Sequence, residues 1–207
     1  MIEELAESSL EELKRADHSI YVSLKYTRTV DIIKNTIKRL LSAFDISIIQ
    51  GLEYAKENKK ISSIPASSHQ RALLMVKFYP QLKRSIEFYT RLKNVDRADY
   101  TKKEEYRKNV ALIAKVGSNK VEVNTEELRN FFDQTVSFTK CVTKITSSKN
   151  FAATKKVCVQ HPVKKIKKDP KKPSDKPAKK VSRLGKNVSE KSYKVNPHAK
   201  ITGFGGY

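Results

Sequence analysis

A long run of apolar residues at helical spacing, between Thr29 and Ala55, constrains the fold of this chain most. Positions three and four apart stack on one side of a helix, so the run predicts one long helix. Ile32, Ile46 and Ile49 widen its apolar stripe, and such a helix needs partners on several sides. We therefore predict the central helix of a bundle. The stripe itself consists of Val30, Ile33, Ile37, Leu40, Leu41, Phe44, Ile48, Leu52 and Ala55.

Other segments carry narrower stripes that could cover the central helix. Residues 2–26 predict a first helix, and the short join at 26–29 makes it an antiparallel neighbour. Thr27 or Thr29 would cap the central helix. Two further helices are predicted on either side of Pro80, which interrupts their pattern, with Ser67 or Ser68 as the cap of the earlier one.

The hydrophobic period changes after residue 100. Residues 100–109 are highly charged and predict a linker or a short helix. Two short β-type runs around Gly117 then predict a hairpin, with a helix over 104–115 as the alternative. Asn124, followed three positions later by Glu127, predicts a capping box for a last helix. The predicted fold of residues 1–147 is mainly α, an antiparallel helical bundle with one short β-hairpin.

The C-terminal part of the chain carries most of the charge. The formal net charge is +21, and residues 149–207 contribute +14 through seventeen basic and three acidic residues. Lysine doublets alternate with prolines there, and so polar a segment buries too little apolar surface to fold alone. We predict that residues 148–207 form a disordered basic tail. Its natural partner is a polyanion, because a lysine near a phosphate releases condensed counterions.

Particular tail residues are predicted to bind nucleic acid. The basic residues would lie along phosphates, and the two aromatic ones, set among glycines, would stack on exposed bases, which favours RNA over DNA. The alternative for the lysines is a targeting signal or a solubilising tail. The alternative for the two aromatic residues is that they belong to a frayed chain end without a binding role. The predicted contacts are Lys164, Lys165, Lys167, Lys168, Lys171, Lys172, Lys176, Lys179, Lys180, Arg183, Phe204 and Tyr207.

A second candidate site lies where the first two predicted helices join. His18, Tyr21 and Lys25 share one helical face, and Arg28 follows directly. A histidine, a tyrosine and an arginine together suit acid–base chemistry or phosphate binding. In the purely structural alternative, His18 and Tyr21 flank the apolar stripe and Arg28 pairs with Asp31. Asp45, inside the apolar helix, is either a solvent-side residue or a buried partner for a base.

Several classes of chemistry have no support in the sequence. The chain lacks a glycine-rich phosphate loop, and the spacing of Cys158 and His161 matches no common zinc finger, so we predict no cofactor and no metal. No apolar run of about 18 residues predicts a membrane span. The acidic N-terminus is unlike a signal peptide. Two cysteines need no disulfide framework, which favours a reducing, cytoplasmic or nuclear-type compartment.

The segment LEELKRADHSIYVSLKYTRTVDIIKNTIKRLL (residues 10–41), with YTKKEEYRKNV and the predicted hairpin and last helix, resembles an archaeal family of helical proteins. The resemblance covers about residues 1–145. More distantly the helices resemble HEPN-type bundles, many of which are ribonucleases or RNA-associated partners. HEPN enzymes carry an arginine, four to six residues and then a histidine. Only two residues separate Arg15 from His18, so the resemblance implies an RNA connection and transfers no catalytic residue.

These observations together predict a non-enzymatic nucleic-acid-binding protein, associated with RNA or with a ribonucleoprotein such as the ribosome. The first rival is a HEPN-like ribonuclease or toxin–antitoxin partner that uses His18, Tyr21 and Arg28. The second rival is a protein–protein adaptor whose basic tail is only an address.

Overall fold

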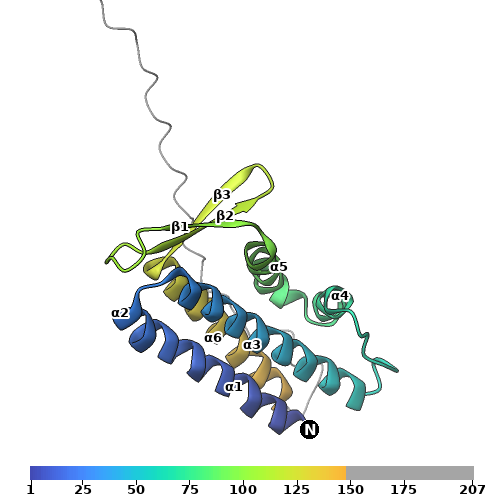
Figure 1. The fold of residues 1–207 in the computed structure, drawn as a ribbon. Coiled ribbons are helices and arrows are strands. Elements are labelled where there is room, and N and C mark those ends of the chain that lie inside the picture. The colour runs from blue at the N-terminus through green and yellow to red at the C-terminus, as the bar shows by residue number, and fades with distance from the viewer. Residues whose placement is uncertain (148–207) are drawn as a thin grey trace, which may run out of the picture. The chain divides into compact units, whose positions relative to one another are not determined.

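The computed structural model describes residues 1–147, which form a helical bundle with a small antiparallel sheet (Figure 1). The elements are α1 (Ile2–His18), a π-helical segment (Ser19–Ser23), α2 (Leu24–Thr27), α3 (Val30–Glu57), α4 (Ser68–Phe78), a 3-10 turn (Pro80–Leu82), α5 (Lys83–Arg97), β1 (Tyr100–Lys103), β2 (Ala111–Val116), β3 (Asn119–Asn124) and α6 (Thr125–Thr146). The mainly helical fold class is thereby confirmed. The tail predicted for residues 148–207 lies outside the described residues.

Helix α3 is the central element, as its stripe predicts. It contacts α1, α4, α5, α6 and β2, so it is surrounded by most of the fold. Ile33, Ile37 and Ile48 are fully buried, and Phe44 stacks on Phe138 of α6 with a centroid distance of 4.6 Å. Full burial of each such side chain contributes roughly 1.5–3 kcal/mol.

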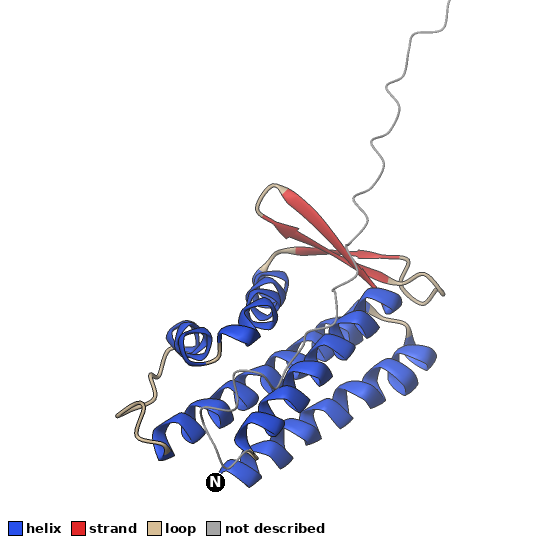
Figure 2. Cartoon of the chain, turned by 180° about the vertical axis from the view of Figure 1, so that it is seen from behind, coloured by secondary structure: helices blue, strands red, loops and turns tan. Residues whose placement is uncertain are grey.

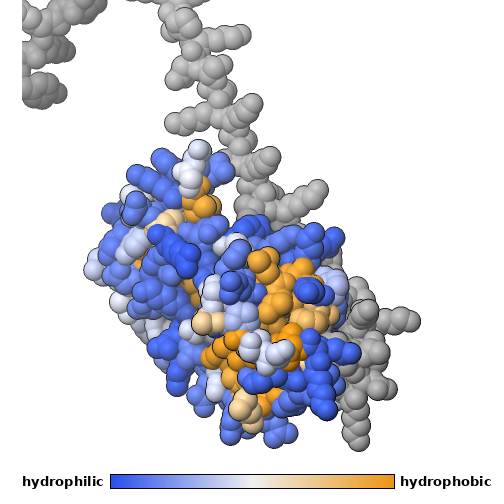
Figure 3. Space-filling view, turned by 90° about the vertical axis from the view of Figure 1, so that its right-hand side faces the viewer, coloured by the Kyte–Doolittle hydropathy of each residue, from blue (hydrophilic) through white to orange (hydrophobic). Residues whose placement is uncertain are grey.

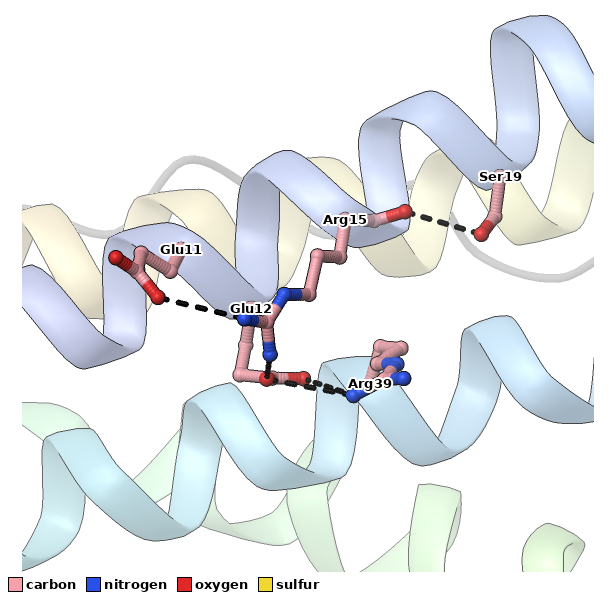
Figure 4. Close-up of polar contacts among 5 residues, drawn as sticks. All are labelled: Glu11, Glu12, Arg15, Ser19 and Arg39. Carbon is pink, nitrogen blue, oxygen red and sulfur yellow. Dashed lines mark hydrogen bonds and ion pairs between the residues drawn. The ribbon is translucent and has the colours of Figure 1, made fainter.

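A buried carboxylate joins α1 to α3. Glu12 is 8% exposed and accepts hydrogen bonds from Arg15 of its own helix, at 2.6 Å, and from Arg39 of α3, at 3.2 Å (Figure 4). Arg15 also reaches Glu11 at 3.5 Å, and Ser19 donates to the Arg15 carbonyl. A buried charge is tolerated where it is paired and hydrogen-bonded, so this cluster fixes how α1 lies on the central helix.

The sheet differs from the predicted hairpin by one strand. Strands β2 and β3 pair around Gly117, whose φ of 59° suits glycine, so the hairpin is confirmed. The prediction of a linker or short helix over 100–109 is wrong in its first part, because Tyr100–Lys103 pairs antiparallel with β2. The helical alternative over 104–115 is also wrong. The buried sheet face packs on α3, α5 and α6, and Figure 2 shows the sheet on one side of the helices.

The helix caps follow the predictions in part. Asn124 accepts a hydrogen bond from the Glu127 backbone N–H at 2.8 Å, as expected for the start of α6. Thr29 and Ser67 occupy cap positions but make no side-chain cap bond. At α3 that role falls to a distant residue, because the Glu105 carboxylate accepts from the Val30 N–H at 3.2 Å.

A polar network holds α4 and α5 against α3. The Tyr89 hydroxyl donates to Asp45 at 2.6 Å, and Lys93 donates to Tyr89 and to Ser68. Arg71 forms an ion pair with Asp45 at 3.9 Å. Asp45 therefore has a basic partner, as in the second alternative, but it is half-buried rather than buried. Burial, and secondly the bond to Asp45, raise the pKa of Tyr89.

Buried phenols predict a loss of stability at alkaline pH. Burial also raises the pKa of Tyr79, whose hydroxyl donates to the Gly51 carbonyl at 3.1 Å. Above about pH 10 these tyrosines ionise in the unfolded chain while they stay protonated in the folded one. The contribution of these two tyrosines to the free energy of unfolding is thus complete below about pH 10. Above that pH it declines by up to about 1.4 kcal/mol per pH unit for each tyrosine.

The Tyr79→Phe/Tyr89→Phe variant tests this expectation. It should be less stable at neutral pH, by about 1 kcal/mol for each lost hydrogen bond. Its free energy of unfolding should fall less steeply than wild type above about pH 10, when both are followed by urea titration and circular dichroism. Lysines titrate in both proteins and cancel in the comparison. Equal slopes would contradict the argument.

Cys141 lies in the core. The predicted reducing compartment stays a prediction. None of the helices in the described part has the length and apolar character needed to cross a bilayer.

Figure 3 looks onto the side where α4 lies and shows apolar side chains gathered in a patch. Leu73 of α4 is 59% exposed.

Candidate nucleic-acid interface

The first helix changes its winding where the candidate polar site begins. After His18 the chain forms a π-helical turn over Ser19–Ser23 before α2 resumes α-helical geometry. Ile20 and Leu24 keep the core contact across this turn, and Tyr21 is 51% exposed. Short π-helical turns inside helices occur frequently at functional sites.

The turn between α2 and α3 is held by the loop that joins β1 to β2. Arg28 ends α2 in the left-handed region, with φ 49°, and its carbonyl accepts a hydrogen bond from the Tyr106 N–H at 2.8 Å. Lys102 reaches Asp31 at 3.2 Å and Glu105 at 3.3 Å. The two hydrogen bonds, first Asp31 and then Glu105, raise the pKa of the Lys102 ammonium. Figure 1 shows α2 and this loop at the same end of the body.

Unusual backbone conformations gather in this region. Arg28, Glu104 and Tyr106 have φ angles of 49°, 49° and 65°. Left-handed conformations cost about 1–3 kcal/mol at non-glycine residues and persist where the surrounding contacts impose them. Here the bond between Tyr106 and Arg28 joins two of the three residues, so the contacts that hold the loop also hold the helix turn.

Aromatic and basic side chains share the surface of this region. The Arg129 guanidinium, from α6, lies 5.2 Å from the ring centroid of Tyr21, and Lys25 lies 5.9 Å from that of Tyr26. Tyr26 and Tyr106 are 78% and 74% exposed. We give the name junction surface to eight exposed aromatic and basic residues of this region, with the exposed Glu104 in the same loop. They are Tyr21, Lys25, Tyr26, Arg28, Tyr106, Arg107, Lys108 and Arg129.

The structure brings together three of the four residues predicted for the polar site. Tyr21, Lys25 and Arg28 lie on the junction surface, and Arg28 donates to the Lys25 carbonyl at 3.3 Å. Asp31 pairs with Lys102, so the predicted Arg28–Asp31 pair is wrong. His18 is exposed and shares no hydrogen bond with the other three within residues 1–147. The predicted tail contacts, Lys164 to Tyr207, lie outside the described residues.

Sequence reasoning missed the part of the junction surface that comes from distant segments. Tyr106, Arg107 and Lys108 fall in the stretch read as a linker, and Arg129 lies on the solvent side of the last helix. A signal was present, since Tyr106 is an aromatic residue within a charged segment. Its position beside α2 depends on the pairing of β1 with β2, which the sequence pattern does not show.

Comparison with known proteins adds no identification, because no family model, curated protein or solved structure matches the chain. Among the described residues, no group of three or more histidine, cysteine, aspartate or glutamate side chains is placed to hold a metal ion. Cys158 and His161 lie outside that part of the chain. Charge and the junction surface are therefore the features of the chain that bear on its function.

Proposed function

We propose that the protein binds nucleic acid, RNA in preference to DNA, without catalysing its cleavage. The observation that carries this proposal is the uneven charge, because residues 149–207 contribute +14 of the total +21. Clustered lysines bind polyphosphate through counterion release, with an affinity largely independent of base sequence. In this proposal the basic tail lies along the phosphates, and the folded body supplies a second, structured contact.

The junction surface supports the proposal from the folded part of the chain. Residues 18–29 contain no acidic side chain, and Lys25 and Arg28 are both exposed. Of the acidic residues nearby, Asp31 and Glu105 are engaged by Lys102, and Glu104 is exposed, so the basic side chains of the region outnumber the acidic ones. Arg107, Lys108 and Arg129 therefore extend a positive surface that suits phosphates.

A binding titration of the full chain tests the proposal. Labelled RNA and DNA single strands of equal length are titrated at a series of salt concentrations. If about six basic residues engage phosphates, log K should fall against log salt with a slope on the order of −4 to −5. RNA should bind more tightly than DNA and should be recovered intact.

Two results would contradict the proposal. Failure to bind either strand at low salt would remove nucleic acid as the partner and would favour the adaptor alternative. RNA cleavage that disappears in His18→Ala would favour the ribonuclease alternative. His18 suits this control, because its side chain is exposed and its replacement should leave the fold intact.

A further inference from the structure

We infer that the junction surface binds unpaired bases, with the rings of Tyr26 and Tyr106 as stacking platforms. This inference rests on the proposed function, since it assigns the kind of nucleic acid that the folded body takes. It concerns residues of the body alone and is independent of the aromatic residues at the C-terminus. Its ligand is a single-stranded or looped segment rather than a continuous duplex.

Both rings are exposed to solvent. Tyr26 and Tyr106 are 78% and 74% exposed, which leaves most of each ring in water. A single exposed aromatic side chain is ordinary on a protein surface. Here two rings stand on segments 80 residues apart in sequence that are joined by the hydrogen bond from Tyr106 to the Arg28 carbonyl. Water-exposed rings held in one region are what base stacking requires.

The backbone that carries Tyr106 is strained. Tyr106 itself has a φ of 65°, and Glu104 and Arg28 are also left-handed. Because side chains strain in this conformation, the loop would be expected to carry glycine or asparagine if it served only as a connection. The contacts from Glu105 to Val30 and from Lys102 to Asp31 hold the loop in place. Strained backbone held by such contacts is concentrated at binding sites.

Basic side chains lie close to the tyrosine rings of this surface. Lys25 lies 5.9 Å from the ring centroid of Tyr26, and Arg129 lies 5.2 Å from that of Tyr21. Arginine and lysine beside an aromatic ring can meet the phosphate of a nucleotide whose base stacks on that ring. The mixture of rings and cations favours a nucleic-acid strand over an apolar peptide, which would leave the cations unpaired.

An unpaired strand fits these groups better than a duplex. In a duplex each base is already stacked between its neighbours, so an exposed tyrosine ring has no free base face to cover. A single strand offers both a base face and a phosphate for every nucleotide. The tail, in contrast, would bind either form, because its lysines respond to phosphates alone. Selectivity for unpaired nucleotides should therefore depend on the junction surface.

The test uses the full chain with Tyr26→Ala and Tyr106→Ala combined. Binding is measured by fluorescence anisotropy with a labelled oligouridylate of about 12 nucleotides and with a duplex RNA of the same length. We expect affinity for the single strand to fall at least about tenfold, because stacking on two rings is lost. Affinity for the duplex should stay within about twofold of wild type, since the tail is unchanged.

Matched variants separate stacking from other effects. Tyr26→Phe with Tyr106→Phe keeps the rings and should bind the single strand as wild type does. Leu10 and Leu73 are 50% and 59% exposed and lie outside the junction surface. Replacing both with alanine should leave the affinity for single strand and for duplex unchanged. Circular dichroism and a urea titration of each variant establish that the fold is retained.

The possible failures point to different conclusions. If the alanine pair loses affinity equally for single strand and duplex, or loses none, stacking on these rings is wrong. A loss of self-association or of a protein partner with unchanged RNA binding would assign the surface to protein instead. If wild type binds no RNA at low salt, the proposed function fails together with the inference. If wild type binds RNA and the double alanine variant binds the single strand equally well, only the inference about the junction surface is rejected.

Discussion

Replacing Ile48 with aspartate is expected to unfold the helical body. Ile48 is fully buried in α3, the helix that contacts α1, α4, α5 and α6. Loss of the apolar side chain costs about 2–5 kcal/mol. An unpaired carboxylate in the same place adds several kcal/mol more, because it loses its hydration without gaining a partner. Typical domains have a free energy of unfolding of about 5–15 kcal/mol. The total cost of the substitution exceeds the lower end of that range.

Ser42→Asp provides the matched control for this change. Residue 42 lies on the same helix and is exposed, so the new carboxylate stays in water. Circular dichroism should show little helix in Ile48→Asp and nearly wild-type helix in Ser42→Asp. A cooperative urea transition in Ile48→Asp with a midpoint close to wild type would show that α3 is not the centre of the fold.

The helices were predictable because their signals are local. The spacing of Ile33, Ile37 and Ile48 repeats every few residues, and the cap formed by Asn124 with Glu127 spans three positions. Such patterns depend on the geometry of one helix alone. The core positions of α3 and α6 follow from the same periodicity without knowledge of the partner helices.

Strand β1 was missed because its pattern carries no burial signal. Three of its four residues are exposed and the fourth is half-buried, so no alternation of apolar and polar residues marks it. It is held by backbone pairing with β2, from Tyr100 opposite Ala114 to Lys103 opposite Ala111. Pairing of that kind depends on a neighbouring strand, which a short charged segment does not specify.

The candidate site shows the same division between local and distant signals. Tyr21, Lys25 and Arg28 were found because they are close in sequence. Tyr106 and Arg129 were missed because tertiary packing brings them to the same surface. The π-helical turn at Ser19–Ser23 was not foreseen either, because the buried residues Ala16, Ile20 and Leu24 follow at steps of four, which an ordinary α-helix also allows.

Removal of the basic tail should have the largest effect on nucleic-acid binding. A chain ending at Ser148 loses seventeen basic residues and retains the described body. If about six of these residues engage phosphates, affinity at low salt should fall on the order of 10³-fold. The slope of log K against log salt should flatten by about four, because the same counterions are no longer released. Anisotropy titrations across a salt series measure both quantities.

A full-length variant distinguishes charge from chain length. Replacing the ten basic residues predicted to contact phosphates with glutamine keeps the tail and removes its charge, and it should reproduce most of the loss. The Tyr26→Ala/Tyr106→Ala variant should behave in the opposite way, with lower affinity for single strands and an unchanged salt slope, because stacking releases no counterions. Equal affinity and slope in the full and shortened chains would show that the tail does not bind phosphate, which leaves the adaptor alternative with the tail as an address.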